Sequence, residues 1–154
     1  MTIHRVVILR GIPGAGKSTY AKKLRAPTGV VEIVSADDYF SRDDGVYRFV
    51  AHQLPAAHAR CLLAFHEAIR DGVALVVVDN TNVTAVEIAP YYALALAYDY
   101  ECEIVTIPCH PHTAHGRCVH GVPLGAIYKM NDALPYQEEL FPQRWEHRRE
   151  RLVR

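Results

Sequence analysis

The segment that most limits the possible folds of this chain is residues 11–18, which read GIPGAGKS. It fits the pattern G-x-x-x-x-G-K-[ST], in which glycines let backbone N–H groups curl around phosphate oxygens. An apolar, β-branched run at Ile3–Leu9 precedes it, and a helix-like segment at Lys17–Arg25 follows it. The start of that helix adds its positive end to the same point. The pattern therefore predicts a nucleotide-binding P-loop between a buried strand and a helix.

The side chains of this loop have separate expected roles. Lys17 supplies a point charge to the β- and γ-phosphates, Ser18 is a ligand of Mg²⁺, and Thr19 is a neighbouring hydroxyl that touches an inner phosphate. A nucleotide with Mg²⁺ is therefore expected at this loop, although the motif alone does not define the reaction. The predicted cofactor-binding residues are Gly11, Gly14, Ala15, Gly16, Lys17, Ser18 and Thr19.

Strand-like and helix-like segments alternate along the remainder of the chain. This alternation predicts an α/β fold with an open parallel sheet covered by helices on both faces. A length of 154 residues fits one domain, residues 1–154, with a polar loop at 35–45 and an Arg-rich polar tail at 143–154. The further predicted strands are 30–34, 73–78 and 103–107, and the further predicted helices are 52–70, a helix capped by Thr84 and running towards Asp99, 112–118 and 124–133.

Acidic residues follow two of the predicted strands. Asp79 ends a buried run and is predicted to be a partner of Mg²⁺, with a turn-forming residue as the alternative. Asp37 and Asp38 follow another strand, where a carboxylate can accept the proton of an acceptor hydroxyl; a helix cap or solvent contact is the alternative for either. The sequence pattern alone does not choose between them. Asn80 and Asn82 either hydrogen-bond a substrate or shape their turn.

Composition excludes several classes of protein. Lys and Arg number 17 and Asp and Glu also 17, so a protein that coats nucleic acid through charge alone is not expected. An enzyme that binds a few phosphates locally remains compatible with this balance. No apolar run approaches the ~18–20 residues that span a bilayer, and no signal peptide is recognisable. We expect no membrane association and a cytoplasmic location, which is the host cytoplasm if the protein is viral.

Residues 109–120 are dense in cysteine and histidine, the residue types that bind zinc. A zinc-stapled lid is one interpretation, but the spacing fits no standard finger. Surface histidines and buried cysteines are the favoured interpretation.

Several of these segments together resemble the bacteriophage-type polynucleotide 5′-kinase family, within the group of small P-loop kinases that includes zeta toxins. The resemblance covers Val6 to about Met130 in order and spacing. Its matching pieces are Gly11–Thr19, Asp37–Tyr39, Asp79–Asn82, and Arg117 followed by Val122-Pro123 and Met130. The stretches Ser35–Phe40, Gly45–Tyr47 and His120–Pro123 look even closer to a cellular branch of the group whose acceptors are poorly defined.

The resemblance implies a three-layer P-loop kinase fold with a sheet of about four to five strands and a small helical lid at about residues 109–123. It implies that Lys17 and Ser18 bind ATP with Mg²⁺, that Asp37 is the general base and that Asp79 is an active-site carboxylate. It also makes Arg117 the lid arginine that stabilises charge on the transferring phosphoryl group.

One position departs from that pattern, because Phe40 stands where the phage enzymes carry an arginine. Arg42 or Arg48 could substitute for it, or the acceptor is held differently. Nearby aromatic residues offer surfaces on which a base can stack. The predicted substrate-contacting residues are Asp38, Arg42, Arg48, Asn80 and Asn82.

The function expected from the resemblance is an ATP-dependent kinase that phosphorylates a hydroxyl of DNA or RNA, first of all a polynucleotide 5′-OH. One alternative is a kinase of 5-hydroxymethyl-pyrimidine bases in DNA, which requires base flipping. Further alternatives are a kinase of small molecules or nucleotides and a non-catalytic nucleotide-binding switch. Nucleic acid is therefore the expected partner, and the sequence does not indicate an oligomeric state.

Overall fold

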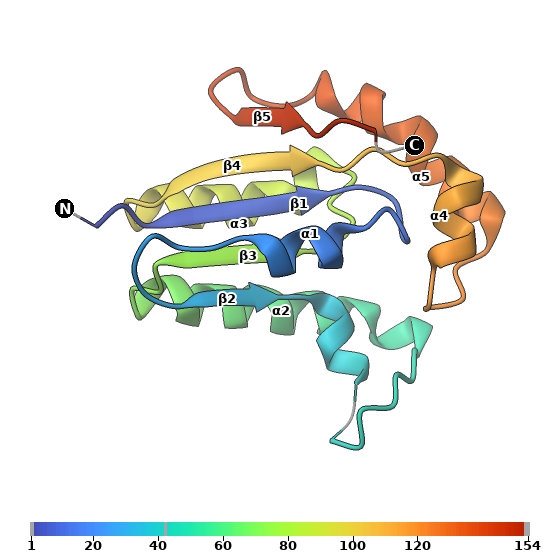
Figure 1. Cartoon of the computed structure of the whole chain (residues 1–154), viewed down its shortest axis with the longest axis horizontal. Helices are drawn as coiled ribbons and strands as arrows, with labels where there is room; N and C mark the ends of the chain where they lie inside the picture. The colour runs from blue at the N-terminus through green and yellow to red at the C-terminus, as the bar shows by residue number, and fades with distance from the viewer. Residues whose placement is uncertain (1, 42, 153–154) are drawn as a thin grey trace.

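A sheet of parallel strands forms the centre of the protein, seen here in a computed structural model that describes residues 2–41 and 43–152 (Figure 1). Within that part the sheet is five-stranded, with the order β2-β3-β1-β4-β5. The α/β class and the parallel sheet predicted from the alternating segments are confirmed. The strands are β1 (Arg5–Arg10), β2 (Val31–Val34), β3 (Leu75–Asp79), β4 (Glu101–Thr106) and β5 (Glu146–Arg149).

Helices cover both faces of this sheet and give it three layers (Figure 1). Successive side chains of a strand point to opposite faces, so each apolar strand serves two cores. Val7 and Val77 pack beside Ala21 of α1 (Lys17–Lys23). Val6, Ile8, Val76 and Val78 pack on the other face with α2 (Leu54–Arg70) and α3 (Ala85–Ala97).

Two further helices, α4 (Pro111–Arg117) and α5 (Leu124–Glu138), stand beyond the carboxyl ends of the central strands (Figure 1). The first of them, α4, falls within residues 109–123, the range predicted to be a small lid, and we call this range the lid segment. Ala114 of α4 and Ile127 of α5 are fully buried in one cluster with Ile12 of the P-loop. The lid segment is therefore packed directly against the loop that is predicted to bind phosphate.

Short 3-10 helices precede α2. The segment 35–45 is not wholly a loop as predicted, because η1 (Ala36–Phe40) lies within it, and η2 (Ala51–Gln53) leads into α2. The Ser35 side chain caps η1 by accepting a hydrogen bond from the N–H of Asp37 at 3.2 Å. The predicted cap of α3 is confirmed, since Thr84 Oγ1 accepts from the N–H of Glu87 at 3.2 Å.

The segment 143–154 is not simply a polar tail, because residues 146–149 form the edge strand β5, parallel to β4. Charged pairs rather than apolar burial attach the side chains of this strand to β4, since Arg148 Nε donates to Glu103 Oε2 at 3.1 Å. Trp145 stacks on Tyr92 with a centroid distance of 5.0 Å and anchors the approach to the strand. A strand held by charges at a sheet edge lacks the apolar pattern that identifies buried strands.

Arg10, the last residue of β1, is a fully buried cation that links the sheet to α5. Its guanidinium donates to the backbone oxygens of Val83 and Leu134 at 2.9 and 2.8 Å. It also donates to Glu138 Oε1 at 2.7 Å, and Glu138 in turn pairs with Arg149 of β5. We call Arg10, Glu138, Arg149 and the nearby His147 the Arg10 cluster.

No helix in the described part of the chain is both long and apolar enough to cross a bilayer. All four cysteines are free thiols, of which Cys61 and Cys102 are buried.

Candidate active site

The P-loop joins β1 to α1 and is confined on one side. Gly14 and Gly16 have φ values of 81° and 99°, in the left-handed region that favours glycine. A Cβ atom at Gly14 would collide with the carbonyl oxygen of Ala114 in α4, whereas one at Gly16 would meet nothing within 4 Å. The loop therefore touches the lid segment at Gly14 and is open at Gly16, at the start of α1.

Lys17 lies largely buried inside this loop, with 8% of its surface exposed. Its Nζ donates a hydrogen bond to the carbonyl oxygen of Ile12 at 2.8 Å. Burial lowers the pKa of Lys17 from 10.5 to about 8, although the charges of Asp79 and Asp37 oppose this shift. A cation that is short of solvent gains strongly from a phosphate placed beside it.

Ser18 and Asp79, the two predicted ligands of Mg²⁺, contact each other directly. Ser18 Oγ donates to Asp79 Oδ2 at 2.7 Å. The pairing follows from the sheet, because β1 and β3 are neighbours and Leu9 is in register with Asp79. Hydroxyl and carboxylate oxygens are the ligands that Mg²⁺ prefers, so this pair fits that ion. Thr19 is exposed one residue further on.

Asp37 and Asp38 lie in η1, which the turn after β3 holds in place. The N–H of Ala36 donates to Asn80 Oδ1 at 2.8 Å. Asn80 directly follows Asp79, so one hydrogen bond connects the segment of the candidate base to the segment of the candidate metal ligand. This connection brings the carboxylates predicted from separate strand ends to one edge of the sheet.

The carboxylate of Asp37 has contacts with two residues that were not among the predicted site residues. Tyr47 Oη donates to Asp37 Oδ1 at 3.2 Å, and His120 Nδ1 lies 3.5 Å from Asp37 Oδ2. The rings of Tyr47 and His120 stack with a centroid distance of 4.2 Å and an angle of 25°. Both residues fall in stretches that carry the family resemblance, and nothing in the sequence indicated that they contact Asp37.

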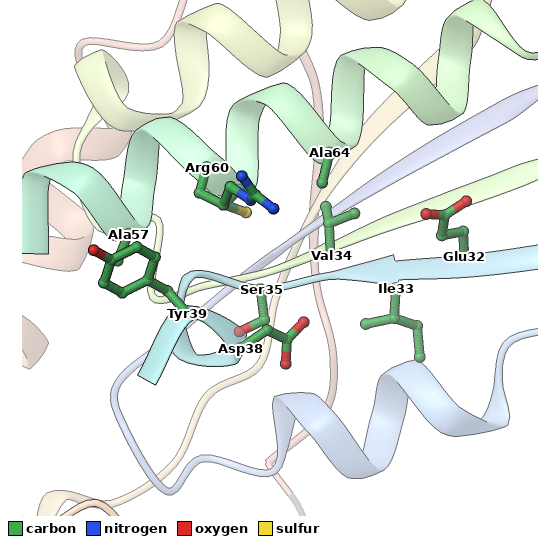
Figure 2. Close-up of a pocket in the computed structure, with 10 residues that line it drawn as sticks. Glu32, Ile33, Val34, Ser35, Asp38, Tyr39, Ala57, Arg60 and Ala64 are labelled. Atoms are coloured by element: carbon green, nitrogen blue, oxygen red, sulfur yellow. The ribbon is translucent and has the colours of Figure 1, made fainter. Parts of the chain in front are cut away.

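Asp38 faces a different environment, a cavity of about 460 Å³ between β2, η1 and α2 (Figure 2). Partial burial raises the pKa of Asp38, and the charges of Asp37 and Asp79 add to the shift. Tyr39 and Arg60 also line this cavity, and Figure 2 shows the Arg60 side chain extending from α2 into the space beside β2. Arg60 was missed from the sequence, because an arginine on a helix is usually a solvated side chain.

Asn80 and Asn82 are buried and bonded within the protein, which favours the turn-shaping alternative over substrate contact. Asn82 is 2% exposed, and its Nδ2 donates to the carbonyl oxygen of Leu9 at 2.7 Å. Its φ of 46° lies in the left-handed region, where asparagine is better tolerated than most residues. The substrate role predicted for these two asparagines is therefore not supported by their contacts.

The two arginines considered as substitutes for the arginine missing at Phe40 have different outcomes. Arg48 pairs with Asp44 at 3.1 Å on the surface, and Arg42 lies outside the described residues. Phe40 itself is buried, with its ring 5.1 Å from that of Phe49. Phe40 therefore packs the η1 segment, and the exposed aromatic surface belongs to Tyr39 and Phe49.

Arg117 is the last residue of α4 and is exposed. Its guanidinium makes no hydrogen bond or ion pair with any residue that the structure describes. The nearby histidines pack on one another: His110 stacks on His112 at 5.9 Å, and His112 contacts the edge of Tyr128. Across residues 2–41 and 43–152, no three His, Cys, Asp or Glu side chains are grouped to hold a metal ion.

Comparison with known proteins gives a family and several similar folds. Residues 6–120 match the model of a family described as an AAA domain, AAA_33. NEDD4-binding protein 2 of Homo sapiens is 40% identical over 98 residues, which are 62% of this chain. The chain spans only 5% of that protein's length.

Solved structures show the same fold at low sequence identity. A chain of the Pnkp1/Rnl/Hen1 RNA repair complex aligns with a TM-score of 0.67 and 17% identity, over 92% of this chain and 47% of the other. A gluconokinase from Sinorhizobium meliloti 1021 aligns with a TM-score of 0.57 and 12% identity, over 97% and 84% of the two chains. These likenesses show a fold shared with P-loop kinase structures.

Proposed function

The chain belongs to this AAA domain family, and from that premise we propose that it is an ATP-dependent kinase of nucleic acid. It transfers the γ-phosphate to a hydroxyl, and the acceptor is a polynucleotide 5′-OH, as in the phage-type polynucleotide 5′-kinases that it resembles. The observation that carries this proposal is the Ser18–Asp79 contact at 2.7 Å, with Asp37 on the adjoining segment. It supports a phosphate donor site and an acceptor base at one edge of the sheet.

In the proposed reaction Asp37 accepts the proton of the acceptor hydroxyl while the oxygen forms a bond to the γ-phosphorus. The bond between that phosphorus and the β–γ bridging oxygen breaks, and ADP leaves. Asp37 suits this task because its side chain is half-exposed and can meet an acceptor.

The donor side rests on the P-loop and the lid. Lys17 binds the β- and γ-phosphates, and backbone N–H groups near Gly16 hold their oxygens. Ser18 and Asp79 would hold Mg²⁺, which neutralises charge on the phosphates when bound. We assign the lid to residues 109–123 and give Arg117 the role of stabilising the transferring phosphoryl group.

Support for nucleic acid as the acceptor comes from the cavity beside Asp38. An aromatic ring stacks on any base, and Tyr39 is 41% exposed at the cavity wall. Arg60 supplies a planar cation for a base or a phosphate. The similar fold within the RNA repair complex agrees in class with such a substrate.

An acceptor panel tests this proposal with γ-labelled ATP and Mg²⁺. The panel contains 5′-OH DNA and RNA strands, 5′-blocked duplexes with and without hydroxymethylated bases, and free nucleosides and nucleotides. The Lys17→Ala variant serves as the matched control and is expected to transfer no label.

We expect label on the 5′-OH strands. Label on the hydroxymethylated duplex alone would identify a DNA-base kinase instead, and label on nucleosides or nucleotides alone would identify a small-molecule kinase. ATP binding with no transfer to any acceptor would leave a nucleotide-binding switch.

A further inference from the structure

We propose that His120 and Tyr47 are positioning residues that orient the carboxylate of Asp37 and connect it to the lid. This inference rests on the proposed function, because it deepens the role of Asp37 as acceptor base. It concerns residues from three separate segments: η1, the loop before α2, and the turn after α4.

Each carboxylate oxygen of Asp37 has one polar side chain beside it. Tyr47 Oη donates to Oδ1 at 3.2 Å, and His120 Nδ1 lies 3.5 Å from Oδ2. Contacts at both oxygens limit rotation of the carboxylate about its terminal bond. The Asp37 side chain is nevertheless 52% exposed, so one side of it stays open to an acceptor.

Tyr47 is itself fixed by its neighbours. The N–H of Arg48 donates to the carbonyl oxygen of Phe40 at 2.9 Å, and Tyr47 pairs with Ser41 in an antiparallel bridge. The Phe40 ring meets the Tyr47 ring edge-on at 6.0 Å. Burial, together with the charge and hydrogen bond of Asp37, raises the pKa of Tyr47 to about 12, so its hydroxyl remains a donor at neutral pH.

His120 belongs to the lid segment and links it to Tyr47. It comes three residues after Arg117, and its ring stacks on Tyr47 at 4.2 Å. The same lid segment touches the P-loop, where Ala114 closely approaches Gly14. The segment therefore contacts the donor loop through Ala114 and the acceptor carboxylate through His120. A shift of the lid would move Arg117 and release Asp37 together.

Four variants test the proposal by steady-state transfer to the acceptor identified by the panel. We expect His120→Ala to lower kcat about 10- to 100-fold, less than the roughly 10²- to 10⁴-fold contribution of a general base itself, while the Kd for ATP stays unchanged. Tyr47→Phe keeps the ring stack and loses the hydrogen bond, so it should lie between wild type and Tyr47→Ala. His115→Ala is the matched control, since His115 is an exposed histidine of the same lid.

A second readout does not depend on activity. We expect the ring NMR resonances of His120 to move in the Asp37→Asn variant, while those of His115 stay in place. Wild-type kcat in His120→Ala, or unmoved His120 resonances, would overturn the proposal. If the wild-type protein labels no acceptor, the proposed function and the positioning role fail together, and the resonances still decide whether His120 contacts Asp37.

Discussion

Asp37 and Asp38 are neighbours in the chain, yet their surroundings differ enough to give them different chemistry. Asp37 is held by Tyr47 and lies near His120, whereas Asp38 lines the cavity beside β2. The sequence pattern could not choose between them as the acceptor base. The family resemblance selects Asp37, and the contacts at its carboxylate are consistent with a group that must be held in one orientation.

Replacement of Asp37 by asparagine should separate binding from transfer. Asparagine keeps the size of the side chain but cannot accept the proton, so we expect ATP binding to be intact and kcat to fall by about 10²- to 10⁴-fold. Rapid-quench measurement of phosphate transfer would test this. Asp38→Asn is the matched comparison: Asp38 lines the cavity proposed for the acceptor, so this variant should raise the KM for the acceptor and keep most of the rate at saturating acceptor. The reverse ranking would assign the base to Asp38.

The charge of Lys17 should make ATP binding depend on pH. Burial lowers the pKa of Lys17 to about 8, so the free protein loses this positive charge as the pH rises through that value. Bound phosphates favour the charged form, so binding above pH 8 must take up a proton. We expect the affinity for ATP to fall above pH 8 by up to about tenfold per pH unit.

Calorimetric titration at pH 7, 8 and 9 in buffers of different ionisation enthalpy would detect both the loss of affinity and the proton uptake. Lys17→Arg provides the control, because arginine stays charged throughout this range. Equal affinity of the wild-type protein from pH 7 to pH 9 would rule out this role for the Lys17 charge.

At the scale of the structural elements, the attachment of β5 and α5 to the rest of the sheet depends on one buried cation, Arg10. Arg10 donates to the carbonyl groups of Val83 and Leu134 and to Glu138, and its guanidinium carbon lies 5.1 Å from the centroid of the Phe141 ring. Breaking a buried pair by removing one partner typically costs about 3–5 kcal/mol. The stability of this end of the sheet should therefore be sensitive to position 10.

We expect Arg10→Met to lower the free energy of unfolding by about 3 kcal/mol, because it leaves the buried carbonyl groups without a donor. Arg5→Met is the matched control. Arg5 pairs with Glu103 at 3.0 Å, but its side chain is 41% exposed, so the expected loss is below about 1 kcal/mol. Urea unfolding measures both values, and equal losses in the two variants would show that burial of Arg10 does not matter.

The Arg10 cluster should also make stability fall in acid. Burial, aided by Arg10 and Arg149, lowers the pKa of His147, although Glu138 opposes the shift. Burial alone would raise the pKa of Glu138, but hydrogen bonds and charges from Arg149 and Arg10 outweigh it and lower that pKa. In both cases the unfolded chain binds protons more readily than the folded protein does. Stability is therefore lost as the pH falls below 6.5 for His147 and below 4.5 for Glu138.

The His147→Gln variant isolates the histidine contribution. Glutamine can keep a hydrogen bond to Thr106, which His147 Nε2 contacts at 2.8 Å, but it does not titrate. We expect the wild-type protein to lose more stability than this variant between pH 7 and pH 5, by at most about 1.4 kcal/mol per pH unit. Denaturant unfolding at the two pH values tests the difference, and identical slopes would exclude His147 as a source.

At the scale of the whole molecule, the features predicted from the sequence are those that depend on local pattern. The apolar run before Asp79 and the glycine loop before Lys17 each identified the end of a strand of the sheet. Because parallel strands carry their ligands at one edge, the meeting of Asp37, Asp79 and Ser18 at that edge was predictable.

Other features depend on contacts between distant segments, and they carry no local signal. The buried role of Arg10 depends on Glu138, which lies 128 residues away. The contact of His120 with Asp37 depends on how the lid folds back. The edge strand β5 is charged, so it lacks the apolar run by which β3 was recognised.

The proposed kinase activity can be tested most directly with one oligonucleotide in two forms, incubated with γ-labelled ATP and Mg²⁺. One form ends in a 5′-OH and the other in a 5′-phosphate, and the sequences are identical. We predict label only on the 5′-OH strand, released by a phosphatase and absent with Lys17→Ala. An unlabelled 5′-OH strand, under conditions in which the protein binds ATP, would contradict the proposed activity.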